Sequence, residues 1–571
     1  MDEIYNGRVR RRNEDLRGTF PFLPMLCSLV LVIATAEGSA AQNLDPALAK
    51  TLPSIRANAI RSHLEFLADD ALEGRHTGSR GFDVAARYVR AQFAAFGLKS
   101  GVADASYFQP VTLRQTNVDA DRSSIVVASD GHQKQLAYNN DFVLFDTHAR
   151  SSGSISAPVV FAGYGVTAKE FQYDDYTGID ARGKIVAVLW FEAPASFPAT
   201  ERAYYMDSHV KCEIARDHGA IGIIEIQGPE MEQKFPWEFM LREVKIGFNS
   251  MRWLDRSDHA FGTVDEIRVD ALLNRSGAAA LFEGEPETLE SVFEAAKAGS
   301  VHTFPLHKTV RVQYTASHTS VNSVNVLSVI RGSDPILSKE FVVLTAHLDH
   351  LGIGPPVDGD NIYNGALDNA AGVSVMLEVA RWFSNLPKPP ARSVAFVALT
   401  GEEQDLLGSS AFANQSPITG VIVADVNVDG GAFIVPVKDV VAYGEEHSSL
   451  GPIARRAAGQ LGLALSPDPF PDEGSFIRSD QYSFIRTGVP SLQLDLGLKS
   501  EKPGVDAVAE MKKWMVTIYH SPKDELSQSI EYDNSARFAR FAALVTYYIA
   551  IDPKQPAWNA NDFFGARFAR R

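Results

Sequence analysis

The spacing of apolar residues changes along the chain and divides it into three parts. Between residues 46 and 112 apolar positions recur every three or four residues, as in the run FDVAARYVRAQF, and this period predicts amphipathic helices. Ser62 and Glu65 have the spacing of a capping box, which predicts that a helix begins at Ser62. Gly97 predicts the end of the following helix.

A different pattern occupies residues 113–315. Short apolar runs such as APVVFAGYGV and GKIVAVLWF are separated by Gly and Asp, which predicts a β-rich unit with one or two helices. One of these helices is expected from Asp207 to His218, followed by the buried strand GAIGIIEI.

From residue 316 near-continuous apolar strands alternate with helices, as in NSVNVLSVI, FVVLTA, ARSVAFVAL and VIVADVNV. Such strands are typical of a mostly parallel sheet that is covered on both faces. The sequence therefore predicts a three-layer α/β/α domain built from residues 46–112 and 316–555, with 113–315 inserted. For the aromatic and basic tail, residues 556–571, both docking and disorder stay open.

Composition narrows the class of protein. A chain of 571 residues with 45% apolar residues is expected to form two or three domains with a large core. The formal net charge of −16 argues against nucleic-acid binding, which requires a basic face. Cys27 lies in an N-terminal apolar segment, and Cys212 is predicted to be a small buried hydrophobe.

The N-terminal residues 1–41 have the features of a secretory signal peptide. Five arginines precede an apolar stretch from Phe20 to Ala36, and Ser39-Ala40-Ala41 offers a cleavage site. An uncleaved membrane anchor is the alternative. With the segment removed, the protein is predicted to be periplasmic or secreted, without a membrane partner.

Candidate chemistry gathers at the predicted strand ends, where ligands bind in open α/β sheets. Taken singly, each candidate residue could instead have an ordinary structural role, such as a helix cap or a solvated surface charge. The candidates are His347 and Asp349 after FVVLTA, Asp368 before a helix starting near Ala370, Glu402 and Glu403 after a strand, Asp429 after another strand, and His520 in a loop. Together they form a nitrogen and oxygen donor set without sulfur, which suits zinc. Two histidines and at least three of these carboxylates make five ligands, which are too many for one tetrahedral ion. Two zinc ions that share a bridging carboxylate fit better.

A separate stretch, the turn with Glu73, Arg75 and His76, is predicted to be solvated.

The segments TAHLDH, GALDNAAGV, LTGEEQDLLGS, NVDG and YHSPKDEL occur in this order. They resemble the co-catalytic two-zinc aminopeptidases, a group that includes bacterial leucyl aminopeptidase and glutamate carboxypeptidase II. The insert, with APVVFAGYGV and YDDYTGIDARGKIVAVL, resembles a protease-associated domain.

The resemblance implies a role for each candidate residue. His347 and Asp429 would bind one zinc, Glu403 and His520 the other, Asp368 would bridge both, Asp349 would orient His347, and Glu402 would be the general base. It also implies a cis peptide bond between Asp368 and Asn369.

Two stretches depart from the family pattern. Gly430-Gly431 stand where relatives often have a bulkier residue, which predicts a wider cleft floor. Gln481 stands where relatives often have His, outside the ligand set. Nearby Phe476, Arg478 and Tyr482 are candidates either for the substrate pocket or for the core.

The predicted function is that of a zinc aminopeptidase acting on peptide or protein N-termini. Three alternatives stay open: a glutaminyl cyclase-like enzyme with one zinc, a carboxypeptidase with an arginine-lined pocket, and a binding ectodomain without catalysis. The preferred residue, the oligomeric state and the role of the insert are left open by the sequence.

Overall fold

The computed structural model describes residues 44–129, 131–145, 148–247 and 250–569. The predicted signal segment lies outside the described residues. Within the described part of the chain, no helix combines the length and the apolar character needed to cross a membrane.

Two sheets organise the described chain. The first, here called the C-terminal sheet, contains in spatial order β20 (Ala464–Ser466), β19 (Asp439–Tyr443), β21 (Ser491–Leu496), β18 (Val421–Val428), β14 (Glu340–His347), β17 (Ser393–Leu399), the C-terminal half of β13 (Phe304–Ile330), β2 (Phe108–Val118) and β11 (Met251–Trp253). Its central strands β17, β14, β18 and β21 are parallel, whereas β13 and β19 are antiparallel to them.

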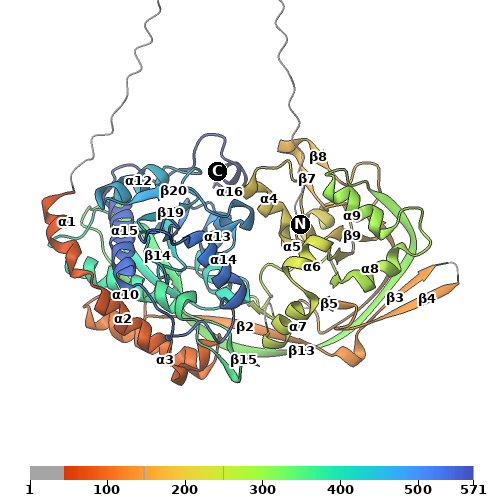
Figure 1. Ribbon diagram of the computed structural model, residues 1–571, viewed down its shortest axis with the longest axis horizontal. Coiled ribbons are helices and arrows are strands. Elements are labelled where there is room, and N and C mark those ends of the chain that lie inside the picture. The colour runs from red at the N-terminus through yellow and green to blue at the C-terminus, as the bar shows by residue number, and fades with distance from the viewer. Residues whose placement is uncertain (1–43, 130, 146–147, 248–249, 570–571) are drawn as a thin grey trace, which may run out of the picture. The chain divides into compact units, whose positions relative to one another are not determined.

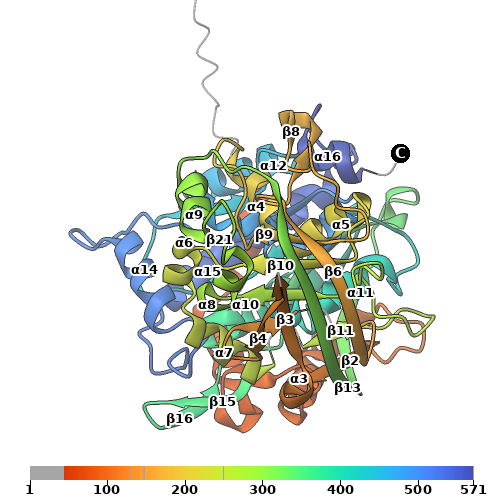
Figure 2. The same cartoon turned by 90° about the vertical axis from the view of Figure 1, so that its right-hand side faces the viewer.

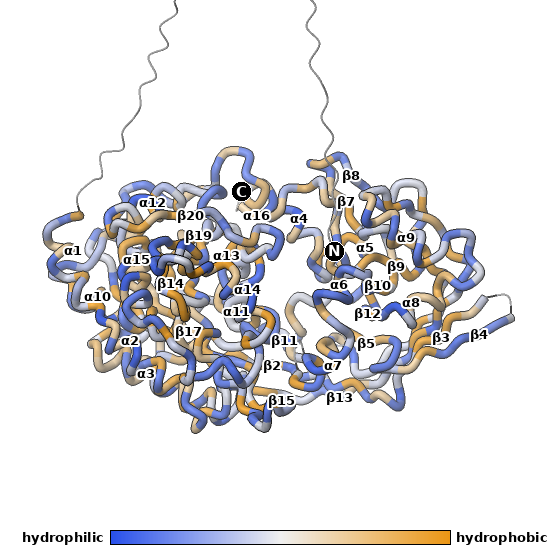
Figure 3. Tube along the Cα trace, in the orientation of Figure 1, coloured by the Kyte–Doolittle hydropathy of each residue, from blue (hydrophilic) through white to orange (hydrophobic). Residues whose placement is uncertain are grey.

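Both faces of the C-terminal sheet are buried, as its apolar strands predicted. Figure 3 colours strands such as β14 and β17 mainly as hydrophobic. Along β14, Val342 and Leu344 belong to one hydrophobic cluster and Phe341 and Val343 to another, because successive side chains point to opposite faces. The first cluster includes α2 (Ala57–Leu67), α3 (Arg80–Ala95), α10 (Ala371–Ser384), α12 (Leu450–Gln460) and α15 (Tyr532–Ile551). The second includes α11 (Leu407–Asn414) and α13 (Gln481–Arg486). The predicted three-layer α/β/α fold is confirmed (Figure 1).

The second sheet, here called the insert sheet, lies within residues 113–315. It contains β4 (His132–Ala137), β3 (Ser124–Ser129), the N-terminal half of β13, β6 (Ser152–Phe161), β9 (Ile185–Leu189), β10 (Gly222–Ile226), β12 (Asp270–Leu273) and β5 (Phe142–Leu144). Its helices include α4 (Ala199–Met206), α5 (Ser208–Asp217), α6 (Pro229–Lys234), α7 (Trp237–Ile246), α8 (Arg275–Phe282) and α9 (Leu289–Lys297). The predicted helix over residues 207–218 and the strand after it are α5 and β10, so both are confirmed.

One strand, β13, belongs to both sheets. Its residue Thr315 pairs with Ser152 of β6, whereas the next residue, Ala316, pairs with Val118 of β2. Figure 2 shows the length of β13, with β2 and β6 beside it. The pattern change at residue 316 therefore marks a change of partner strands within one unbroken strand.

The first predicted helix start is wrong. Helix α2 begins at Ala57, and the Ser62 hydroxyl donates to the carbonyl oxygen of Asn58 within the helix at 2.9 Å. Glu65 pairs with Arg61 one turn earlier at 2.8 Å. A serine inside a helix can satisfy its hydroxyl in this way, so the capping-box spacing was coincidental. The predicted end at Gly97 is confirmed, because Gly97 follows α3 with φ of 77°.

The described part of the C-terminal tail, residues 556–569, is docked, which decides between the two alternatives that the sequence left open for it. The Trp558 indole donates to the carbonyl oxygen of Gly488 at 3.1 Å. In α16 (Phe563–Phe568), Phe564 is fully buried in a cluster shared with insert residues, and Arg567 donates to Glu170 at 3.1 Å. The tail thus contacts both the insert and the C-terminal part of the chain.

Candidate metal centre

Three parallel strand ends bring the candidate residues together. β14 ends at His347 and lies between β17 and β18. The turn carrying Glu402 and Glu403 follows β17, and Asp429 follows β18 directly. Because the three strands are parallel, their carboxyl ends meet at one edge of the sheet, where α/β folds place their ligands.

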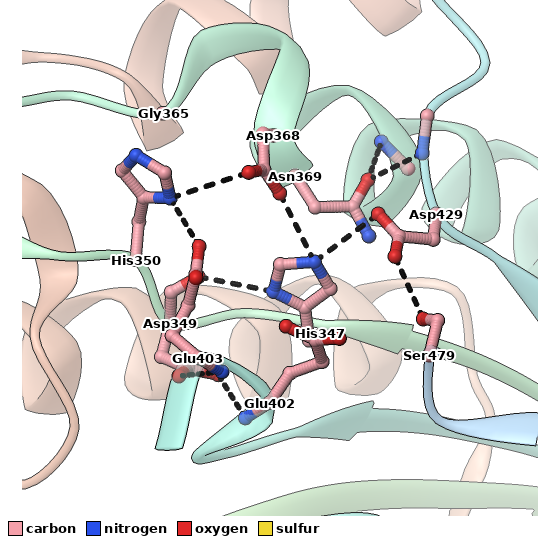
Figure 4. A network of polar contacts seen from close by, with 12 residues as sticks. His347, Asp349, His350, Gly365, Asp368, Asn369, Glu402, Glu403, Asp429 and Ser479 are labelled. Carbon is pink, nitrogen blue, oxygen red and sulfur yellow. Dashed lines mark hydrogen bonds and ion pairs between the residues drawn. The ribbon is translucent and has the colours of Figure 1, made fainter. Parts of the chain in front are cut away.

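His347, Asp368 and Asp429 form the first group of candidate ligands (Figure 4). The Nε2 atom of His347 lies 3.2 Å from Oδ1 of Asp429 and 3.3 Å from Oδ1 of Asp368. The second oxygen of Asp429 accepts a hydrogen bond from the Ser479 hydroxyl at 2.7 Å, which fixes the carboxylate.

The second group contains Glu403 and His520. The Nε2 atom of His520 lies 3.2 Å from Oε2 of Glu403 and 3.3 Å from Oδ2 of Asp368. The two oxygens of Asp368 are therefore divided between the two groups, Oδ1 toward His347 and Oδ2 toward His520. This is the arrangement that a carboxylate bridging two ions requires.

His350 is a site residue that sequence reasoning missed. It is fully buried, and its Nδ1 lies 2.6 Å from Oε1 of Glu403 and 3.8 Å from Oδ2 of Asp368. His350 thereby holds one oxygen of Glu403 and leaves the other facing His520. The available signal was the second histidine of HLDH, one residue after Asp349.

The Asp349 carboxylate organises the turn after β17. It accepts hydrogen bonds from the main-chain N–H groups of Glu402 and Glu403 at 3.2 and 3.4 Å, and from the Thr77 hydroxyl at 3.0 Å. Its contact with His347 uses the carbonyl oxygen of Asp349 instead, 3.2 Å from Nδ1 of the ring. That contact leaves Nε2 of His347 facing the carboxylates.

The turn bearing Asp368 is held from two sides. The Asp524 carboxylate, which was not assigned a role from the sequence, accepts from the N–H groups of Leu367 and Asp368 at 3.0 Å. The Asn369 side chain donates to the carbonyl oxygen of Val428 at 3.0 Å and so ties this turn to β18. The peptide bond between Asp368 and Asn369 is cis, as the resemblance implied.

The carboxylates of the site give it a negative charge that favours the binding of cations. Burial disfavours the charged form of His347, but Asp429, Glu402 and Asp368 outweigh it and raise its pKa well above its ordinary value. Burial acts in the same way on His520, whose pKa Glu403 and Asp368 raise strongly. These imidazole and carboxylate groups fit zinc, because all donors are nitrogen or oxygen. Within the group of His347, Asp368 and Asp429, the ligand atoms lie within 4.8 Å of one another.

Glu402 lies beside these groups, with a carboxylate oxygen within 4.8 Å of ligand atoms of His347 and Glu403. Burial raises the pKa of Glu402 well above its ordinary value, Asp429 and Glu403 add to the rise, and His347 opposes it. A carboxyl group in this setting binds a proton more readily than a solvated one, which suits a proton acceptor.

The predicted wider cleft floor at Gly430 and Gly431 is wrong. A Cβ atom at Gly430 would lie 2.7 Å from Oδ1 of Asp495, and one at Gly431 would lie 2.7 Å from the Phe538 ring. Both glycines have positive φ, 117° and 87°. The space of the missing side chains is therefore filled by neighbours.

The segment RSDQ, residues 478–481, makes hydrogen bonds to residues next to the site. Gln481 is fully buried, accepts from the Asn427 amide at 3.0 Å and donates to the carbonyl oxygen of Phe476 at 3.0 Å. Phe476 and Tyr482 belong to the buried core, so the core alternative holds for them, whereas the Arg478 side chain is 47% exposed.

The prediction of a solvated turn is wrong for Arg75. Its residue surface is only 1% exposed, and its guanidinium contacts the carbonyl oxygen of Leu348, which lies between His347 and Asp349. The turn that ends at Arg75 contains three consecutive residues with positive φ, namely Glu73, Gly74 and Arg75. This turn directs the Arg75 side chain inward, and no local sequence pattern predicted it.

The insert also approaches the site. Helix α7 packs on β15 (Gly352–Val357), the strand that follows His350, and its Glu243 is buried. Burial raises the pKa of Glu243, and Glu403 adds to the rise, while His520 and Arg242 lower it. A carboxyl group of the insert thus lies within electrostatic range of the second ligand group.

Residues 325–546 match the sequence profile described as Peptidase family M28. This match confirms the predicted resemblance to zinc exopeptidases for the part of the chain that carries all five candidate ligands.

Among curated proteins, aminopeptidase YwaD of Bacillus subtilis is 25% identical over 263 residues, which are 43% of this chain and 48% of YwaD. A probable zinc metalloprotease of Pyrenophora teres f. teres is 36% identical over 111 residues, 19% of this chain and 23% of that protein. The chain thus aligns with about half or less of the length of these relatives. Among solved structures, the aminopeptidase from Aneurinibacillus sp. strain AM-1 is 18% identical with a TM-score of 0.49, covering 90% of this chain and 99% of that one.

Proposed function

Starting from the peptidase family M28 match of residues 325–546, we propose that this protein is a two-zinc aminopeptidase. The observation that carries the proposal is the division of the Asp368 oxygens between two ligand groups, one with His347 and one with His520. Each group supplies one imidazole and one further carboxylate. One tetrahedral ion could not use the whole set, whereas two ions sharing Asp368 could.

The chain's own residues suggest a hydrolytic mechanism. Zinc, when bound, supplies Lewis-acid activation of a water molecule and of the scissile carbonyl. Glu402 accepts the proton of the attacking water and delivers it to the leaving amine. Asp349 positions Glu402 by accepting from its main-chain N–H at 3.2 Å. Glu402 is therefore the proposed general base, and Asp349 a positioning residue.

The substrate's free amino group needs a carboxylate near the scissile bond. Glu243 of the insert is the proposed partner, because it is buried, its charge interacts with His520 and Glu403, and Arg242 contacts it only at 3.4 Å. An ammonium group placed there would form a charge-assisted hydrogen bond. The insert, proposed to be a protease-associated domain over residues 113–315, would in this way select substrates with a free N-terminus.

The proposed location of the enzyme rests on the sequence alone. The signal-like segment over residues 1–41 supports a periplasmic or secreted enzyme that acts on peptides outside the cytoplasm. Measuring the N-terminal residue of the mature protein would test this, since retention of residues 1–41 would favour the anchor.

The experiment for the main proposal measures zinc per chain and hydrolysis of an aminoacyl-p-nitroanilide panel. Wild type, Glu402→Gln and Glu378→Gln are compared. Glu378 is a buried carboxylate in α10 that pairs with Arg381 at 2.6 Å, so Glu378→Gln controls for the loss of a buried charge. We expect near two zinc ions in all three, and a fall in kcat of roughly 10²- to 10⁴-fold only in Glu402→Gln.

Other outcomes identify the alternatives. About one zinc ion, with cyclisation of N-terminal glutamine and no amide hydrolysis, would indicate the cyclase. Cleavage only of N-blocked peptides with a free carboxyl terminus would indicate a carboxypeptidase. Neither zinc nor hydrolysis would leave a binding ectodomain.

A further inference from the structure

Arg75 joins two backbone segments that carry the candidate ligands. Its Nε donates to the carbonyl oxygen of Leu348 at 2.9 Å, directly after His347. Its Nη1 and Nη2 donate to the carbonyl oxygens of Asn364 and Gly365 at 2.6 and 3.0 Å, just before the turn with Asp368. Nη1 also donates to the carbonyl oxygen of Leu67, the last residue of α2. The planar guanidinium thus joins the two ligand-bearing segments to each other and to the end of α2.

The neighbours of Arg75 continue the same connection. The main-chain N–H of His350 donates to the carbonyl oxygen of Arg75 at 3.3 Å. Two residues later, the Thr77 hydroxyl donates to the Asp349 carboxylate at 3.0 Å. Residues 75–77 therefore touch the segment from His347 to His350 at several points.

The backbone is shaped to deliver this arginine. Glu73, Gly74 and Arg75 have φ of 50°, 66° and 52°, a run of left-handed conformations that non-glycine residues rarely adopt. A Cβ atom at Gly74 would lie 2.3 Å from the carbonyl oxygen of Tyr363. The turn is packed directly against the strand that leads to Asn364.

The charge of Arg75 also suits its place. Burial lowers the pKa of Arg75 to about 10, and Asp349, Asp524, Asp368 and Glu403 oppose that change. The side chain therefore stays cationic behind a group of carboxylates. Its hydrogen bonds go to main-chain carbonyl oxygens, so these carboxylates keep their oxygens for other partners.

From this geometry we infer that Arg75 is a positioning residue for the metal centre, which sets the spacing between His347 and the bridging Asp368. The inference rests on the proposed function, because it concerns the same ligands. Arg is required because its fork reaches Leu348 on one side and Asn364 and Gly365 on the other. A lysine keeps the charge but presents a single donor atom and cannot span both segments.

The chain offers a matched control in Arg392. It is also fully buried and also donates to main-chain carbonyl oxygens, those of Ile549 at 3.1 Å and Lys554 at 3.0 Å. It pairs with Glu340 at the start of β14, roughly 23 Å along the strand from His347 at about 3.3 Å per residue. Arg392→Lys thus reproduces the loss of a buried guanidinium far from the ligands.

The test measures zinc affinity of the full chain by chelator competition for wild type, Arg75→Lys and Arg392→Lys. The melting temperature of each metal-free protein and the visible spectrum of its cobalt form are recorded as well. We expect both variants to melt lower without metal, but only Arg75→Lys to lose zinc affinity, by roughly 10- to 100-fold. Only its cobalt spectrum should change, because the spectrum reports the ligand geometry.

The inference would be overturned if Arg75→Lys kept the zinc affinity and the cobalt spectrum of the wild type. It would also be overturned if both variants lost zinc affinity equally. If the wild-type protein bound no zinc, both the inference and the proposed function would be wrong. If Arg75→Lys does not fold, amide hydrogen exchange of the wild-type protein tests the inference instead. Zinc binding should slow exchange both in residues 72–77 and in residues 364–370. If zinc slowed exchange in residues 364–370 but not in residues 72–77, the inference would be overturned.

Discussion

Two clusters of buried charged groups, one at the metal centre and one in the insert, differ in the source of their positive charge. At the metal centre, Asp368, Glu403 and Asp429 face imidazoles in all of their ion pairs within the described chain. An imidazole is a metal ligand as well as a weak base, so this cluster is suited to receive external cations.

The insert cluster, here defined as Lys211, Glu225, Glu192 and Asp175, carries its own cation. Lys211 is fully buried, and its ammonium group donates to the carbonyl oxygens of Leu189 and Glu192 at 2.5 and 2.9 Å. Burial lowers the pKa of Lys211, while Glu225, Glu192 and Asp175 raise it. The comparison teaches that buried carboxylates alone do not mark a metal site, and that the available cation decides.

Metal removal should separate the two clusters most strongly. Exhaustive chelation should abolish peptidase activity, with recovery on addition of about two equivalents of zinc, because ligand groups of this kind bind the ion as part of the fold. The melting temperature should fall as well, since zinc binds only the native state. Full activity in protein shown to be metal-free would contradict the proposed function.

Lys211→Met should affect only the insert cluster. Loss of its ammonium group should leave the buried carbonyl oxygens of Leu189 and Glu192 without their donor, at a cost of about 1–3 kcal/mol of unfolding free energy for each. Urea denaturation measures this change. Zinc affinity should stay at the wild-type value, and a parallel loss of zinc would show that the clusters are coupled.

Stability should depend on pH through Glu225. Burial raises its pKa to about 7, with Lys211 opposing, above the ordinary value of 4.5. Between pH 4.5 and about pH 7, Glu225 is ionised in the unfolded chain but keeps its proton in the folded chain. The free energy of unfolding therefore falls as the pH rises toward 7, and above pH 7 Glu225 changes it no further. The loss should be on the order of 3 kcal/mol.

Urea denaturation at pH 5 and pH 8 measures this change. Glu225→Gln should lack this part of the pH dependence, whereas the control Glu378→Gln should keep it. An identical pH dependence in wild type and Glu225→Gln would contradict the prediction.

The smallest expected effect concerns Glu243, a buried insert carboxyl whose charge interacts with His520 and Glu403. Glu243→Gln should raise KM for substrates with a free amino terminus by roughly tenfold, because a hydrogen bond to a charged group contributes about 1.5 kcal/mol or more. The value of kcat should change little. Glu238→Gln, at an exposed position in the first turn of α7, is the control. An unchanged KM in Glu243→Gln would remove the insert from amine recognition.

Much of the metal centre could be predicted from the sequence because His347, Glu402, Glu403 and Asp429 lie at or just after the ends of strands. Apolar runs such as FVVLTA located β14, and the residues after each run were then placed at one edge of the sheet by the parallel arrangement. The structure brings together all five candidate ligands with Asp349 and Glu402 at that edge. Their roles stay predictions until zinc and activity are measured.

Other features depended on contacts between residues distant in the chain. Arg75 was expected to be solvated, yet it is buried because its carbonyl partners come from Leu348 and Asn364, 273 and 289 residues away. His350 gained its place through Glu403, 53 residues later. No local period encodes such contacts.

The sequence by itself determined the order of strands and helices and the chemical nature of the donor set, since both depend on local spacing and residue type. The tertiary structure decided three other matters: that β13 serves two sheets, that the tail docks on both parts of the chain, and that Arg75 lies behind the ligands. The physical reason is that burial depends on which distant backbone groups are available as partners, and only the folded chain supplies them.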